Sequence, residues 1–82
     1  MDGKRLFLLR TVTLSRLLNR SVSQYELGTA LGLNIASAAR RVRKWEKDEE
    51  AISGPTILAL MFLEVACADS YLFDRYWRKR FK

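Results

Sequence analysis

Residues 23–47, SQYELGTALGLNIASAARRVRKWEK, decide the fold of this chain of 82 residues. Ser23 and Glu26 have the S-x-x-E spacing of a capping box, in which two side chains satisfy backbone N–H groups at the start of a helix. One apolar helical face follows, made of Leu27, Ala30 and Leu31. Gly32 then offers the left-handed conformation in which many helices end. The pattern predicts a helix over residues 23–32.

The second half of this stretch, residues 35–47, predicts an amphipathic helix with Asn34 as its N-cap. At about 100° per residue, one continuous arc of the helical wheel holds Ile35, Ala38, Ala39, Val42 and Trp45. The opposite arc holds Ser37, Arg40, Arg41, Arg43, Lys44 and Lys47, with Ala36 among them. This division indicates that one arc faces a core, while the other presents an almost wholly cationic surface.

Residues 4–20, KRLFLLRTVTLSRLLNR, leave two alternatives open. Leu14, Leu17 and Leu18 make a helical face, but the β-branched run Thr11-Val12-Thr13 weakens a helix at that point. Either one long helix runs over about residues 5–19, which we prefer, or a short extended arm precedes a helix that begins near Thr13.

The C-terminal half predicts two further helices after an acidic link. Pro55 stands where proline is favoured, in the first turn of a helix over residues 55–68. That helix is apolar nearly all round, so we expect it at the centre of the core. Asp69 or Ser70 can cap a last helix over residues 70–80. We therefore expect a single all-α domain, residues 1–82, built as a compact bundle of four to five short helices.

Composition narrows the range of partners. Lys and Arg outnumber Asp and Glu by 15 to 9, which gives a net charge of +6 and a pI near 10.0. A small domain this basic usually meets a polyanion. The sequence has no histidine and a single cysteine, Cys67, which excludes an internal disulfide, a His/Cys zinc site and nucleophile–histidine catalysis. We expect no catalytic residues, no metal and no cofactor, and we expect Cys67 to be a core residue.

No membrane or export segment is expected. The apolar run 57–68 is interrupted by Glu64 and is too short to span a bilayer, and Leu6–Leu9 is too short for a signal peptide. We therefore expect a cytoplasmic protein.

The segment Ser23–Asn34 resembles the core of lambda-repressor-like regulators, the Cro and xenobiotic-response-element type of helix-turn-helix protein. Their pattern is S-Q-x-x-L-A-x-x-L-G-x-S, and the matching positions here are Ser23, Gln24, Leu27, Leu31 and Gly32. Gly28 stands in place of the alanine and Asn34 in place of the last serine. The pair Trp45-Glu46 and the proline of the following leucine-rich segment are also similar to features of that family.

One departure concerns spacing. Trp45 lies about four residues further from Gly32 than in the family, which predicts a recognition helix about one turn longer than usual. Counting from Gly32, the base-reading positions hold Ala36, Ser37, Ala39 and Arg40. Counting back from Trp45, they hold Arg40, Arg41, Arg43 and Lys44. Arg40 is the residue that both counts select.

The resemblance implies a sequence-specific, double-stranded DNA-binding regulator, such as a repressor, with residues 35–47 in the major groove. The expected base contacts are Ser37, Arg40, Arg41, Arg43 and Lys44, and the expected phosphate contacts are Ser23, Gln24 and Lys47. We expect a homodimer without a small-molecule ligand. Its candidate surfaces are the last helix, through Leu72, Phe73, Tyr76 and Trp77, and the segment Leu6–Leu9. The alternatives are a protein-interaction module on the same scaffold, such as an anti-activator or adaptor, and a membrane-surface or RNA-binding protein using residues 71–82.

Overall fold

The computed structural model describes residues 1–81, and over that part the chain is all-helical, as expected. Its first element is one continuous helical path of three parts: α1 (Gly3–Leu8), the π-helical segment η1 (Leu9–Leu14) and α2 (Ser15–Leu18). The single-helix alternative is therefore confirmed, but the β-branched run widens the helix in its middle. The Thr11 hydroxyl donates to the Phe7 carbonyl at 2.7 Å, a side-chain bond of the kind that competes with regular helical geometry.

Helix α3 (Gln24–Ala30) begins and ends as its sequence predicts. The Ser23 hydroxyl accepts from the Glu26 N–H, and the Glu26 carboxylate accepts from the Ser23 N–H, so the capping box is complete. At the other end Gly32 is left-handed, with φ of 85°. The N–H of Leu33 then reaches the Gly28 carbonyl at 3.0 Å, which closes the helix with a Schellman motif.

Helix α4 (Ala38–Glu46) is shorter than expected, and the prediction of a helix over residues 35–47, one turn longer than usual, is wrong. Asn34 does not cap it either. The Asn34 side chain accepts from the Ala36 N–H at 2.9 Å and its carbonyl accepts from the Ser37 N–H at 3.0 Å, so a turn forms there and Ser37 becomes the N-cap. Residues 35–37 therefore belong to the connection between α3 and α4, and Ile35, expected on the buried arc, is 70% exposed.

The C-terminal half contains α5 (Gly54–Cys67), α6 (Ser70–Tyr76) and the short 3-10 segment η2 (Arg78–Arg80). Pro55 lies in the first turn of α5 as predicted, and Asp69 caps α6 by accepting from the N–H groups of Tyr71 and Leu72. The expected helix 70–80 thus ends four residues early and continues as a tighter turn.

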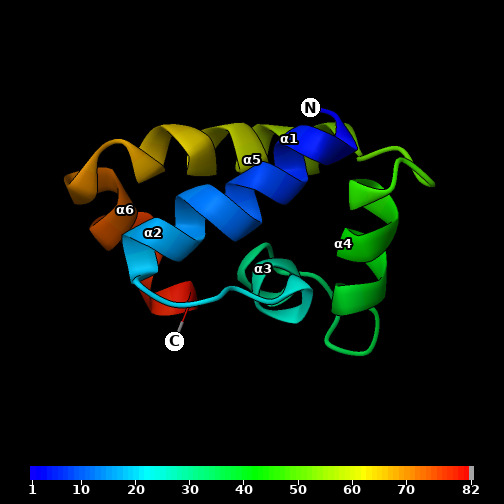
Figure 1. The fold of residues 1–82 in the computed structure, drawn as a ribbon, viewed down its shortest axis with the longest axis horizontal. Helices are drawn as coiled ribbons and strands as arrows, with labels where there is room; N and C mark the ends of the chain where they lie inside the picture. Colours follow the sequence, from blue (N-terminus) through cyan, green and yellow to red (C-terminus); the bar gives the residue numbers. More distant parts are fainter. Residues whose placement is uncertain (82) are drawn as a thin grey trace.

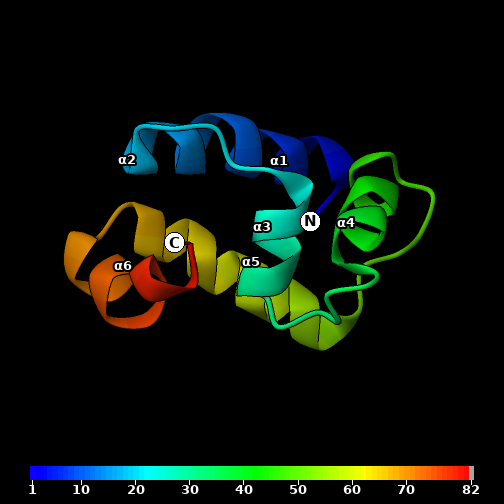
Figure 2. The same ribbon diagram turned by 90° about the horizontal axis from the view of Figure 1, so that it is seen from below.

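The helices form a bundle with α4 at one end (Figures 1 and 2). Seen from below, the α1–α2 path lies along one side, α5 and α6 lie along the other, and α3 lies between α1 and α5 (Figure 2). The core joins all of these elements, and its largest fully buried side chains are those of Trp45, Phe73, Leu6, Leu14, Leu27, Leu60, Leu63 and Val42.

The core corrects three expectations about packing. Phe73 is fully buried and Trp77 is 6% exposed, so neither can serve the expected dimer surface on the last helix. Leu6 and Leu9 are likewise buried, which removes half of the alternative surface at Leu6–Leu9. Helix α5 is not enclosed on all sides. It buries Leu60, Leu63 and Ala66 and leaves its opposite face exposed.

Candidate nucleic-acid interface

Helices α3 and α4 pack against each other at unusually close range. A Cβ atom on Gly28 would lie 2.7 Å from the Cβ of Ala38 and 2.8 Å from its carbonyl oxygen. Two helix backbones can approach this closely only where the facing residues are small. The glycine at position 28, a departure from the pattern S-Q-x-x-L-A, therefore has a steric reason, which is the entry of α4 immediately beside α3.

The inner face of α4 holds it against the rest of the bundle. Ala38 and Val42 are fully buried, and Trp45 is 1% exposed. The outward arc therefore carries the cations. Arg40, Arg43 and Lys47 are exposed and Lys44 is half-buried. Within residues 1–81 none of these four side chains makes a hydrogen bond or an ion pair, so their donors are available to a ligand.

Arg41 and Ser37, the other two expected base contacts, lie at the border of this arc. The Arg41 guanidinium lies 5.5 Å from the centre of the Trp45 ring and 3.9 Å from the Glu50 carboxylate. Ser37 is half-buried and its hydroxyl donates to the Asn34 carbonyl at 3.4 Å. The structure thus brings Arg40, Arg43 and Lys44 together on one open surface and sets Ser37 and Arg41 beside it.

A hydrogen-bonded network fixes the C-terminal end of α4, and it includes one of the expected phosphate contacts. Arg10, from η1, donates to both oxygens of the Glu46 carboxylate at 2.6 and 2.9 Å and to the Val22 carbonyl at 2.9 Å. Gln24, at the start of α3, donates to the same carboxylate at 3.0 Å. The Gln24 side chain therefore points into the network.

Ser23, the second expected phosphate contact, is exposed, but its hydroxyl already serves the capping box. Glu26, its partner, is half-buried. Burial by itself raises the pKa of Glu26, yet the hydrogen bonds from the Ser23 N–H and from Arg20 outweigh it and hold that pKa below its usual value. Glu26 therefore stays ionised and keeps the first turn of α3 intact.

The N-terminus of the chain docks on the same end of α4. The Gly3 N–H donates to the Asp48 carboxylate at 2.9 Å, and a Cβ atom on Gly3 would clash with the carbonyl of Glu46. Asp48 itself is left-handed, with φ of 56°, and ends the helix. Sequence reasoning anticipated neither Gly3 nor Arg10. The visible signal for Arg10 was a lone arginine inside an apolar run, which needs a partner when it is buried.

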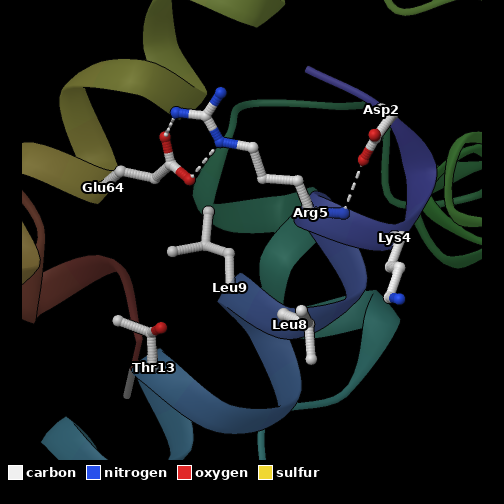
Figure 3. Close-up of a pocket in the computed structure, with 7 residues that line it drawn as sticks. All are labelled: Asp2, Lys4, Arg5, Leu8, Leu9, Thr13 and Glu64. Atoms are coloured by element: carbon white, nitrogen blue, oxygen red, sulfur yellow. Dashed lines mark hydrogen bonds and ion pairs between the residues drawn. The ribbon is translucent and has the colours of Figure 1, made fainter.

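A separate hollow of about 450 Å³ lies between α1, η1 and α5 (Figure 3). It is lined by Asp2, Lys4, Arg5, Leu8, Leu9, Thr13 and Glu64. Arg5 donates to both carboxylate oxygens of Glu64 at 2.9 and 2.6 Å, so the acid is neutralised by its neighbour (Figure 3). The hollow therefore combines the apolar side chains of Leu8 and Leu9 with a paired charge, and the Asp2 carboxylate at its edge accepts from the Arg5 N–H at 2.7 Å.

Three other features were sought in the described part of the chain: a metal site, a reactive cysteine and a membrane-spanning helix. Residues 1–81 contain no group of three or more His, Cys, Asp or Glu side chains that could hold a metal ion. Cys67 is half-buried, and burial, together with the nearby Glu64 charge, raises the pKa of its thiol to about 11. A thiol with so high a pKa is a poor nucleophile at neutral pH. In the same residues no helix has the length and apolar character needed to cross a membrane.

Comparisons with protein-family models, with curated proteins and with solved structures found no significant match to this chain.

Proposed function

We propose that this protein is a sequence-specific DNA-binding regulator of the helix-turn-helix type, with α4 as its recognition helix. The observation that carries the proposal is the outward arc of α4, where Arg40, Arg43, Lys44 and Lys47 lie without protein partners on a helix whose other face is buried. The major groove of B-DNA admits one helix, and arginine can donate two hydrogen bonds to a guanine. A fixed helix with unpaired guanidinium groups suits that task.

The expected site residues divide by how readily they reach DNA. Arg40, Arg43 and Lys44 are free to contact base edges as they stand, and Lys47 is free to contact a phosphate. Arg41 can join them at little cost, because its 3.9 Å contact with Glu50 joins two exposed groups and such pairs contribute little to stability. Ser37, Ser23 and Gln24 would each have to exchange a present hydrogen bond for one to DNA.

We extend the proposal to a cytoplasmic homodimer that acts as a repressor. One domain of 82 residues offers few base contacts. Small DNA-binding domains commonly increase the number of contacts by binding as dimers to symmetric half-sites about one helical turn of DNA apart. Two α4 helices would then occupy successive major grooves. A protein held there can block the access of other proteins to the same DNA.

The decisive experiment is the selection of binding sites from a random DNA library, followed by titration of the selected and scrambled duplexes. Loss of one bidentate arginine costs about 1–3 kcal/mol, so Arg40→Ala should weaken binding to the selected site by about 5-fold to 150-fold for each half-site that the dimer occupies. Arg75→Ala, which removes an exposed arginine from α6, is the matched control and should keep the sequence preference. Equal affinity of the native chain for every duplex, or undiminished binding by Arg40→Ala, would contradict the proposal.

A further inference from the structure

Helix α5 carries an apolar stripe on its solvent face that the described part of the chain leaves largely open, although the Phe62 ring also contacts the rings of Tyr76 and Trp77. Leu58 is 69% exposed, Val65 60%, Met61 46% and Phe62 38%. Their spacing of three, one and three residues places them on one face of the helix, opposite the buried Leu60, Leu63 and Ala66. We call these four residues, 58, 61, 62 and 65, the α5 stripe.

The spacing of the α5 stripe, three, one and three residues, is symmetric about a point between Met61 and Phe62. If a second α5 is laid against the first in the opposite direction around that point, Leu58 of each copy meets Val65 of the other, and Met61 meets Phe62. Branched aliphatic side chains then pack together, and a methionine sulfur meets an aromatic ring, which is a favourable contact. The stripe can therefore complement itself, as an interface between two identical chains requires.

The distribution of charge also favours the α5 stripe as the surface for self-association. Two chains that each carry +6 repel one another. The outward arc of α4 cannot be where they meet, because like charges would face each other there. On α5 the one ionisable acid, Glu64, is already paired with Arg5, and the stripe itself carries no charge. The four side chains of the α5 stripe thus bring no like charges together, and the neighbouring Arg75, which stacks on Tyr76 at 5.6 Å, belongs to the rim of the surface.

We propose that the α5 stripe is the homodimer interface, formed by antiparallel packing of α5 from two copies of this chain. The stripe and Tyr76, whose ring lies 5.3 Å from that of Phe62 and is 48% exposed, offer apolar surface. That surface is on the order of 500 Å², at the upper end for a monomer, and with its polar rim it approaches the roughly 800 Å² per partner of a standard interface.

The arrangement is also compatible with DNA, and in this respect it rests on the proposed function. Helix α4 stands at the end of the bundle where α5 begins (Figure 1). An antiparallel pair of α5 helices, each about 21 Å long, therefore places the two α4 helices at opposite ends of the dimer. Their separation is then of the order of the ~34 Å between successive major grooves.

The test uses the full chain and measures its mass by sedimentation equilibrium without DNA. The native protein should be a dimer in the micromolar range. Leu58→Lys and Val65→Glu should each be monomeric, because each buries two unpaired charges in the dimer. Leu8→Lys, at an exposed leucine of α1, is the matched control and should remain dimeric. Circular dichroism checks that every variant keeps its helical content.

The register is tested by charge pairing. An equimolar mixture of Leu58→Lys and Val65→Glu chains should regain a heterodimer, because one pair of opposite charges then faces across one end of the stripe. A chain with both changes should regain the homodimer, because such a pair then forms at both ends. A native chain that stays monomeric, single variants that remain dimeric, or a double variant that stays monomeric would overturn the proposal. Failure of the proposed function looks different, since the dimer would then persist while the selected DNA is not preferred.

Discussion

Arg10 and Glu46 form a two-bonded ion pair across 36 positions of sequence, with N–O distances of 2.6 and 2.9 Å. Their side chains are only 12% and 5% exposed. The pair joins the widened π-helical segment to the last residue of α4, and Gln24 joins α3 to the same carboxylate. Glu46 is thus the point at which three helical segments fix the orientation of the proposed recognition helix.

Replacement of Glu46 by alanine should destabilise the fold strongly. Removing one partner of a buried pair leaves an uncompensated charge and costs about 3–5 kcal/mol, so we expect that loss in the free energy of unfolding measured with urea. Asp74→Ala, which breaks the exposed pair with Arg78, is the control and should cost at most about 0.5 kcal/mol. A Glu46→Ala protein that matches this control would show that the pair is not structural.

The second prediction concerns Gly28, where α3 and α4 approach closely. A methyl group there would meet Ala38 at 2.7 Å, so Gly28→Ala should lower the free energy of unfolding by about 1–3 kcal/mol, despite the better helix propensity of alanine. Gly54, at the start of α5, has no atom within 4 Å of its would-be Cβ. Gly54→Ala is therefore the control; because Pro55 follows it, a Cβ there disfavours the helical backbone slightly, and thermal unfolding should show a clearly smaller loss than for Gly28→Ala. Equal effects of the two changes would refute the steric argument.

Only part of this fold can be predicted from the sequence, because some features depend on neighbouring residues and others on contacts between distant segments. The capping box at Ser23 and the left-handed Gly32 involve neighbours within a few residues, so spacing alone predicts them correctly. The predicted start of α4 was wrong because the Asn34 side chain stabilises a turn as readily as it caps a helix. The Arg10–Glu46 pair and the exposed face of α5 depend on which segments meet in space. Periodicity cannot supply that information.

Cys67 should react slowly at neutral pH. Its pKa is raised from 9.0 to about 11, so at pH 8 the thiolate fraction is about 100-fold lower than in the unfolded chain. Alkylation by iodoacetamide should accelerate roughly 100-fold on unfolding, with the rate in the native protein rising up to pH 11. Because the unfolded thiol ionises first, the stability contributed by the neutral thiol is present below about pH 9 and is lost between pH 9 and 11. Fast modification of the folded protein at pH 7 would contradict the buried setting.

Lys47 should contribute to DNA affinity without contributing to sequence preference. It lies on the outward arc of α4 beyond Trp45, exposed and unpaired within residues 1–81, where we propose a phosphate contact. Each neutralised phosphate adds about 0.9 to the slope of log affinity against log salt concentration. Lys47→Ala should therefore reduce that slope by about 0.9 for each half-site, or about 1.8 for the proposed dimer, and weaken the selected and scrambled duplexes by equal factors. Lys79→Ala, which removes the same charge from the C-terminal segment, is the control and should leave the slope unchanged. If Lys47→Ala instead altered the preferred sequence and kept the slope, Lys47 would contact bases, and the arc would be turned further into the groove than we propose.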